Sequence, residues 1–340
     1  MKSRFVKIIL SILFVLIVGV SAGYHFVTYT PHGRIDMPMA LILRMVNLFG
    51  DQKSPYDYTP QEFRKTMDDI LLSTQRKQEP IKHVEDRELE WAKGAIPVRI
   101  YSPSSEKKLP VILYFHGGAW VSGSLATHDN HCRRLATISN AVVVAVDYSL
   151  APEEKFPTPL EQGYFVLQWL VANAADMDID INKIIVAGDS AGGTLAAGVC
   201  MMARDRNGPD IRYQILLYPV TDLSTFATES HKNFGEGYFL TSESIKWARE
   251  LYLTDEKQAT NPLVSPLLAE KLDDLPPALI VTAQFDPLSS EGRAFAEKLK
   301  AAGNDSRNLH VPGVLHGFGQ SQSAKASNVL NIIAEICARL

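Results

Sequence analysis

The chain has 340 residues, of which 46% are hydrophobic and 21% are charged, so it is long enough to bury one large core with peripheral additions. Its net charge of −4, without a basic patch interleaved with aromatic residues, excludes nucleic acid from the expected partners. The three cysteines are too few, and odd in number, for a disulfide framework.

The N-terminus differs in composition from the rest of the chain. Three basic residues lie within the first seven positions, and an apolar stretch of 20 residues follows at 8–27. This length suits a membrane-crossing helix, and the flanking positive charges predict a cytoplasmic N-terminal end. We predict a signal anchor in residues 1–28, with the catalytic domain on the non-cytoplasmic side of the membrane. The alternative is a signal peptide that is cleaved near Ala22, which would release the protein.

Residues 29–80 are predicted to be helical and polar, apart from an apolar stretch at 39–46. From residue 81 onward, short β-type runs alternate with helical patterns, and this alternation predicts a mostly parallel sheet with right-handed crossovers. The predicted strands are 81–91, 96–101, 111–115, 141–147, 183–188, 211–218, 278–283 and 306–311. Helices are predicted over 127–139, from 242 onward, over 289–302 and at the C-terminus.

The third predicted strand ends in the sequence HGGAW at residues 116–120. Small residues after a strand leave backbone N–H groups unobstructed, and Gly117, Gly118 and Ala119 can offer them to a developing oxyanion. His116 heads this loop, and we interpret it as a residue that shapes the loop through hydrogen bonds rather than as a catalytic group. An ordinary Gly-Gly turn is the alternative.

The sequence GDSAGG at residues 188–193 follows an apolar run and precedes a small, helix-compatible stretch. A strand, a sharp turn and a helix would place Ser190 at the corner, where a base can reach its hydroxyl. Small residues two positions before and after the serine allow such a strained turn. The N–H of Ala191 would complete the oxyanion hole, and Asp189 is interpreted as a group that fixes the turn. A tight turn with a helix-capping serine is the alternative.

A nucleophilic serine requires a base downstream. His316 lies in a loop after the last predicted strand, where it can approach the end of the sheet. His310 lies inside that strand, and His231 lies in a polar stretch with no strand before it. We therefore select His316 as the base.

The base requires a carboxylate that orients it. Asp286 follows the predicted strand 278–283 and so lies at its carboxyl end, whereas Asp273 and Asp274 precede that strand and would lie at the opposite edge. Asp222, after the strand at 211–218, is the competing candidate.

His128 and His131 have a spacing that could fit metal ligands. They fall at the start of a predicted helix with no further ligand cluster nearby, so we expect a solvated helix face. We predict neither a metal nor a cofactor.

Five motifs together carry a family resemblance. They are HGGAW at 116–120, DYSLAPE at 147–153, GDSAGG at 188–193, DPL at 286–288 followed by Glu291 and Gly292, and HGF at 316–318. This pattern resembles the hormone-sensitive-lipase-like family of α/β-hydrolases, which includes bacterial carboxylesterases and relatives of arylacetamide deacetylase, over residues 80–340. The resemblance implies an α/β-hydrolase fold, with a mostly parallel eight-stranded sheet flanked by helices in residues 81–340.

The resemblance also implies roles for single residues. Ser190 would be the nucleophile, Asp286 the orienting acid and His316 the base. The oxyanion donors would be the N–H groups of Gly118, Ala119 and Ala191, with Gly117 keeping the loop tight; residues 29–80 and 222–260 would form a small helical cap. The family's third loop glycine is Ala119 here, and its usual arginine in the DYSLAPE segment is Ser149. The resemblance therefore implies the catalytic groups more firmly than it implies the family's substrate preference.

These features predict a serine carboxylesterase that acts on small-molecule esters of short to medium acyl chain through an acyl-enzyme. An amidase or deacetylase could use the same triad, and a hydrolase-like binding protein that has lost catalysis is the alternative from another class. The retained base at His316 favours an enzyme.

Overall fold

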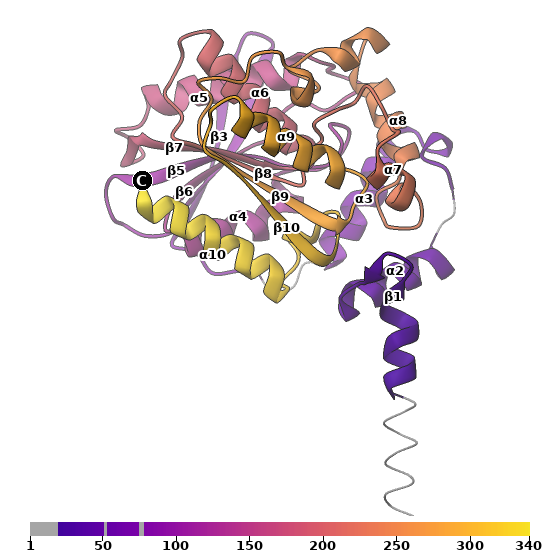
Figure 1. The fold of residues 1–340 in the computed structure, drawn as a ribbon. Helices are drawn as coiled ribbons and strands as arrows, with labels where there is room; N and C mark the ends of the chain where they lie inside the picture. Colours follow the sequence, from indigo (N-terminus) through magenta and orange to yellow (C-terminus); the bar gives the residue numbers. More distant parts are fainter. Residues whose placement is uncertain (1–19, 51–52, 75–77) are drawn as a thin grey trace, which may run out of the picture.

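The computed structural model describes residues 20–50, 53–74 and 78–340. An eight-stranded sheet, seen as a fan of arrows in Figure 1, has the spatial order β10-β9-β8-β7-β5-β6-β4-β3. The β3–β4 and β4–β6 pairs are antiparallel and the other pairs of this sheet are parallel. The predicted fold class and its mostly parallel sheet are therefore confirmed. The strands are β3 (His83–Trp91), β4 (Gly94–Ser102), β5 (Leu109–Phe115), β6 (Val142–Val146), β7 (Ile179–Asp189), β8 (Tyr213–Leu217), β9 (Ala278–Phe285) and β10 (Ser306–Leu315).

Helices cover both faces of the sheet, which explains why its central strands read as continuous apolar runs. All five residues of β6 are buried. In Figure 1, α4 and α10 lie on one face, whereas α5, α6 and α9 lie on the other. These helices are α4 (Leu125–Ser139), α5 (Thr158–Ala172), α6 (Ala191–Asp205), α9 (Ser289–Ala301) and α10 (Ala324–Arg339).

The registers bring three carboxyl-terminal strand ends together. Leu217 of β8 pairs with Val281 of β9, and Asp189, the last residue of β7, pairs with Leu217. Leu315 ends β10 opposite Phe285, the last residue of β9. Residues 190, 286 and 316 therefore follow strands that end at the same edge, which is where open α/β sheets place their ligands.

The last strand differs from the prediction at its end. It was expected to stop at residue 311, but β10 continues to Leu315 after a register shift. Pro312 has no N–H for the ladder, and Gly313, at φ +74°, donates its N–H to the Gln284 side chain instead. This irregularity interrupts the pairing for a few residues, after which the strand delivers His316 directly to the sheet edge.

Two segments outside the sheet lie against each other. The N-terminal segment contains the short hairpin β1 (Tyr29–Thr30) and β2 (Gly33–Arg34), α2 (Met37–Phe49), the 3₁₀ turn η1 (Pro55–Asp57) and α3 (Pro60–Thr74). The second segment contains α7 (Glu229–Phe234) and α8 (Ser242–Tyr252). Phe63 of α3 packs on Trp247 of α8, with ring centroids 4.7 Å apart. Tyr252 of α8 stacks on Trp120 at 4.6 Å, so these segments also contact the predicted oxyanion loop.

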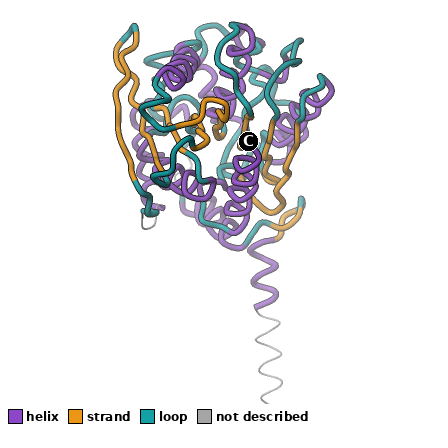
Figure 2. Tube along the Cα trace, turned by 90° about the vertical axis from the view of Figure 1, so that its left-hand side faces the viewer, coloured by secondary structure: helices purple, strands orange, loops and turns teal. Residues whose placement is uncertain are grey.

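Residues 1–19, which contain most of the predicted anchor, lie outside the described residues. The helical segment 20–28 projects away from the body of the protein in both views (Figures 1 and 2). Within the described ranges, none of the helices combines the length and the apolar character that crossing a membrane requires.

Candidate active site

Ser190 lies at the turn between β7 and α6 with a backbone conformation that few non-glycine residues adopt, φ +53° and ψ −122°. The close approach of neighbouring backbone explains the glycines around it. A Cβ on Gly188 would lie 2.3 Å from the Gly192 oxygen, and a Cβ on Gly192 would lie 2.0 Å from the Phe115 oxygen. The sequence motif therefore produces the sharp turn that presents the serine hydroxyl at the sheet edge.

A continuous row of hydrogen bonds joins three of the predicted site residues. The Ser190 Oγ lies 2.9 Å from Nε2 of His316. The other ring nitrogen of His316, Nδ1, lies 2.8 Å from Oδ2 of Asp286. The Asp286 side chain is 1% exposed and that of His316 is 8% exposed, so the surrounding protein excludes most of the water that would weaken these contacts.

Neighbouring groups hold the acid and the imidazole in place. The second Asp286 oxygen, Oδ1, accepts the backbone N–H of Leu288 at 2.9 Å. Tyr218, at the end of β8, meets the His316 ring edge to face at 4.9 Å. With one carboxylate oxygen bonded to the backbone and the other to Nδ1, the imidazole can present only Nε2 to the serine.

The alternative candidates lie elsewhere. His310 contacts Thr282 Oγ1 at 3.1 Å inside β10, and His231 contacts Ser242 in the second segment. Asp222 accepts the N–H and the hydroxyl of Ser224. In the part of the chain that the structure describes, none of these three side chains forms a hydrogen bond with Ser190.

The loop after β5 combines a left-handed backbone with unobstructed N–H groups. Gly118 has φ +121° and Ala119 has φ +55°. A Cβ on Gly118 would lie 2.1 Å from the Ser122 oxygen, so glycine is required there, while the Gly118 oxygen accepts the N–H of Ser122 at 2.9 Å. Among the described residues, no acceptor bonds to the N–H groups of Gly118, Ala119 or Ala191.

The N–H of Gly117 donates to a side chain of the protein and so is not free to bind an oxyanion. It donates to Oδ1 of Asp189 at 2.9 Å, and the Tyr114 hydroxyl donates to the same oxygen at 2.7 Å. A Cβ on Gly117 would lie 2.6 Å from Oδ2 of Asp189. Of the four residues predicted for the oxyanion hole, Gly117 therefore has a structural role, because the Asp189 carboxylate occupies its only backbone donor.

Asp189 is a buried carboxylate whose pKa lies below the usual range. Burial alone would raise this pKa, but the nearby His128, whose Nε2 lies 3.5 Å from Oδ1, and the hydrogen bond from Tyr114 outweigh that effect. Gln320 donates to the second oxygen at 3.3 Å. Asp189 thus links the nucleophile turn, the loop after β5 and the segment that follows His316.

His116 is buried at the base of the same loop and stays neutral at ordinary pH. Burial lowers its pKa to about 3, and the nearby His128 contributes in the same direction. Its Nδ1 lies 2.8 Å from the Gly117 oxygen, and its ring stacks on Tyr148 at 4.3 Å. The Tyr148 hydroxyl also donates to the His116 backbone oxygen at 2.7 Å. These contacts are those of a residue that shapes the loop.

The expectation of a solvated face at the start of α4 is wrong. His128, Asp129 and His131 are 5%, 5% and 3% exposed. Burial lowers the pKa of His131 to about 4, and Asp129 binds the side chains of Arg99 and Arg133. No group of three or more His, Cys, Asp or Glu side chains within the described ranges is arranged to hold a metal ion.

Three contributors were missed from the sequence. Tyr114 and His128 support Asp189, and Arg64 of α3 donates to the backbone oxygens of Val121 and Ala151, each at 2.6 Å. The tyrosine belongs to the continuous apolar run of β5, a pattern that also suits simple packing. Arg64 belongs to no recognisable motif in the N-terminal segment. It reaches the oxyanion loop only through the fold of the chain.

Known proteins of similar sequence belong to the same fold family or are named as ester hydrolases. A family model described as alpha/beta hydrolase fold matches residues 112–320. The arylesterase of Saccharolobus solfataricus is 36% identical over 275 residues, which cover 80% of this chain and 89% of that protein. The carboxylic ester hydrolase LipN of Mycobacterium tuberculosis is 41% identical over 241 residues, which cover 69% of this chain and 64% of LipN.

Solved structures of esterases also match the chain. The hyperthermophilic esterase from Pyrobaculum calidifontis superposes with a TM-score of 0.84 at 36% identity, over 90% of this chain and 98% of that chain. An ester hydrolase from the metagenome of Lake Arreo superposes with a TM-score of 0.85 at 32% identity, over 90% and 98%. The chain therefore belongs to the α/β-hydrolase family, in its hormone-sensitive-lipase-like group of carboxylesterases, and is an ester hydrolase of that group.

Proposed function

We propose that this protein is a serine carboxylesterase that uses Ser190, His316 and Asp286 as its catalytic triad. The observation that carries the proposal is the unbroken hydrogen-bonded row from Ser190 Oγ through both ring nitrogens of His316 to Asp286, at 2.9 and 2.8 Å. Such a row activates a hydroxyl that is otherwise a weak nucleophile.

In the first half of the reaction, His316 takes the Ser190 proton as Oγ attacks the ester carbonyl. The carbonyl oxygen becomes an oxyanion, which accepts hydrogen bonds from the N–H groups of Gly118, Ala119 and Ala191. Asp286 keeps the tautomer of His316 fixed and stabilises the imidazolium. The imidazolium then gives its proton to the departing alcohol, and the acyl group remains on Ser190.

In the second half, a water molecule replaces the alcohol. His316 takes a proton from this water as its oxygen attacks the acyl-enzyme, and the same three N–H groups bind the second oxyanion. When this intermediate collapses, the proton returns to the Ser190 oxygen and the carboxylic acid leaves. No cofactor or metal takes part in either half of this mechanism.

We propose esters of short to medium acyl chain as the substrates. Two modest segments, around α2–α3 and α7–α8, accompany the sheet, and they leave little length for an extended acyl-binding domain. A relative from Pseudomonas putida, 37% identical over 227 residues, is named an ethyl acetate hydrolase, which is in keeping with a short acyl group.

The test is a series of p-nitrophenyl esters of increasing acyl length, offered to the full chain, to Ser190→Ala and to an exposed-serine control, Ser105→Ala. We expect turnover by the wild type and the control, greatest for short and medium chains. Ser190→Ala should lose several orders of magnitude in kcat. Wild-type turnover by Ser190→Ala would refute the proposal, and anilide substrates that turn over faster than the matched esters would favour an amidase.

A further inference from the structure

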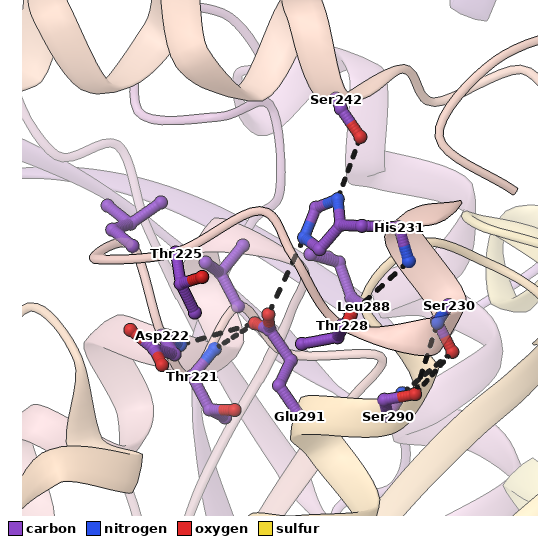
Figure 3. Close-up of polar contacts among 12 residues, drawn as sticks. Thr221, Asp222, Thr225, Thr228, Ser230, His231, Ser242, Leu288, Ser290 and Glu291 are labelled. Atoms are coloured by element: carbon purple, nitrogen blue, oxygen red, sulfur yellow. Dashed lines mark hydrogen bonds and ion pairs between the residues drawn. The ribbon is translucent and has the colours of Figure 1, made fainter. Parts of the chain in front are cut away.

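A buried carboxylate lies in α9, outside the catalytic row. Glu291 is 1% exposed, and its Oε1 accepts the backbone N–H groups of Thr221 and Asp222 at 2.7 and 3.2 Å (Figure 3). Its other oxygen, Oε2, is buried and has no hydrogen-bond partner among the described residues. A buried carboxylate oxygen without a partner is costly, so a second group is needed to balance it.

The group that faces this oxygen is the imidazole of His231, whose Nε2 lies 3.8 Å from Oε2. The other ring nitrogen, Nδ1, lies 2.8 Å from the hydroxyl of Ser242, the first residue of α8. The ring also meets Phe226 edge to face at 5.2 Å. A single side chain of α7 therefore contacts α8 on one side and α9 on the other, as Figure 3 shows.

A second connection between α7 and α9 lies beside the first. The hydroxyls of Ser230 and Ser290 are 2.7 Å apart, and each also accepts the other residue's backbone N–H, at 3.0 and 3.3 Å. Adjacent residues on both helices thus form the contact, which fixes the orientation of α7 on α9 as well as its distance.

Both elements that Glu291 joins lead directly to the catalytic groups. The helix α9 begins three residues after Asp286, and it lies so close to β9 that a Cβ on Gly292 would be 2.9 Å from the Thr282 side chain. The loop that Glu291 holds starts at Tyr218, which packs on the His316 ring. Within that loop, the Val220 oxygen accepts the Thr194 hydroxyl of α6 at 2.6 Å.

We propose that Glu291 and His231 are a pair of positioning residues for ester hydrolysis. Glu291 holds the loop 218–222 that supports His316, and His231 fastens the segment 222–260 to α9. Substrate binding under that segment and the orientation of the base then depend on the same buried carboxyl. The inference rests on the proposed esterase function.

The proton of the Glu291 carboxyl gives the pair a pH dependence. Burial raises the pKa of Glu291, so the folded protein holds this proton to higher pH than the unfolded chain does. The unfolded chain releases this proton at lower pH, so the contribution of the pair to stability is present at low pH and lost as pH rises through the folded pKa. Loss of the proton leaves a buried charge at Oε2, which has no hydrogen-bond partner among the described residues, and the contact between α7 and α9 should then weaken.

Other charged side chains lie around His231. Lys246 and Arg249 of α8 lie over the Phe226 ring, on which His231 packs. Asp222 lies in the loop 218–222, where its backbone N–H donates to Glu291. Glu229 and Lys232 are exposed on α7 itself. We assign the expected pH dependence to the Glu291 carboxyl, which faces His231 directly.

Four variants separate the parts of this proposal. Glu291→Gln keeps an acceptor for the two backbone N–H groups but cannot ionise, and Glu291→Ala removes the acceptor. His231→Gln keeps an amide near the position of Nε2, whereas His231→Asn keeps one near Nδ1. Glu297→Gln and Lys232→Gln, at exposed positions on the same two helices, are the matched controls.

Two measurements apply to each variant: kcat and KM for a p-nitrophenyl ester between about pH 5 and pH 9, a range that begins just above the ordinary pKa of a glutamate, and hydrogen exchange of residues 221–252 over the same range. We expect Glu291→Ala to raise KM and to accelerate exchange, each on the order of 10-fold, since it leaves two buried N–H groups unpaired. We expect the ratio of wild-type to Glu291→Gln kcat/KM to fall about threefold or more as pH rises, because only the wild type has a carboxyl at this position that can lose its proton. The KM of His231→Gln should be closer to the wild-type KM than that of His231→Asn, because the glutamine keeps an amide near the position of Nε2, which faces Glu291.

A glutamate that served stability alone would lower the stability of its variants and leave their kcat/KM at the wild-type value at every pH. A wild-type to Glu291→Gln ratio that is flat with pH, together with wild-type exchange in both His231 variants, would overturn the proposal. Failure of the esterase assignment looks different, because the wild type would then turn over no ester at all. The pH dependence of hydrogen exchange would still test the pair in that case.

Discussion

The buried carboxylate beside the nucleophile provides a quantitative test of how the site is held together. Asp189→Asn keeps the shape of the side chain and removes its charge. Oδ1 now accepts hydrogen bonds from Tyr114 and from the Gly117 N–H at 2.7 and 2.9 Å, and His128 lies 3.5 Å away. Hydrogen bonds to a charged group contribute about 1.5–3 kcal/mol each. An asparagine retains part of both bonds through its carbonyl, so we expect a loss of about 3 kcal/mol in the free energy of unfolding at neutral pH, in line with breaking a buried charged pair.

The pH dependence of this loss has a definite sign. The pKa of Asp189 is lowered in the folded protein, so its contribution to stability is fully present above the pKa of the unfolded chain, near 4, and is lost as pH falls through the folded pKa. The stability difference between wild type and Asp189→Asn should therefore be constant from neutral pH down to about pH 5 and shrink at lower pH.

Urea unfolding of wild type and Asp189→Asn at several pH values measures both quantities. Asp210→Asn, at an exposed position whose nearest cation is Arg212 at 3.5 Å, is the control and should change the unfolding free energy by less than about 0.5 kcal/mol. If Asp189→Asn unfolds at the wild-type urea concentration at neutral pH, or if its deficit grows as pH falls, the role assigned to Asp189 is wrong.

Three further predictions concern the catalytic groups. Gly118→Ala places a Cβ 2.1 Å from the Ser122 oxygen at a residue with φ +121°, so the loop must shift. The kcat for a p-nitrophenyl ester should then fall by about 10²–10³. A fall of less than tenfold would contradict the oxyanion role. Asp286→Asn should lower kcat by about 10⁴ with a nearly unchanged KM, and steady-state kinetics that show a KM effect alone would contradict its assignment. His116→Gln should lower kcat and leave the acidic limb of the pH–rate profile unchanged, because the pKa of His116, about 3, lies below that limb. A displaced limb would show that His116 titrates during catalysis.

Sequence patterns predicted most of the fold and the hydrogen-bonded row of Ser190, His316 and Asp286 for a physical reason. Parallel strands that are covered on both faces must be apolar throughout, and the turns at their carboxyl ends must be small where backbone approaches backbone. Ser190 and His316 lie directly after such strands. The rule that these strands end at one edge is sufficient to bring the two residues together.

The supporting groups could not be predicted in this way. His128 lies in the first turn of α4 among polar neighbours, which resembles a solvated face, yet the fold buries it with its Nε2 3.5 Å from Oδ1 of Asp189. Arg64 and His231 act through contacts with elements about 60 residues or more away in sequence. The strand end at Leu315 was missed because Pro312 and Gly313 signal a turn, whereas the sheet accommodates them as an irregularity.

The most direct test of the central claim is to locate the covalent adduct that a fluorophosphonate probe forms with the full chain. We expect a single adduct, mapped by peptide mass spectrometry to Ser190, formed in parallel with the loss of ester turnover and absent from Ser190→Ala. Continued ester turnover without labelling of Ser190, or an adduct on another residue that accounts for the inactivation, would contradict the account.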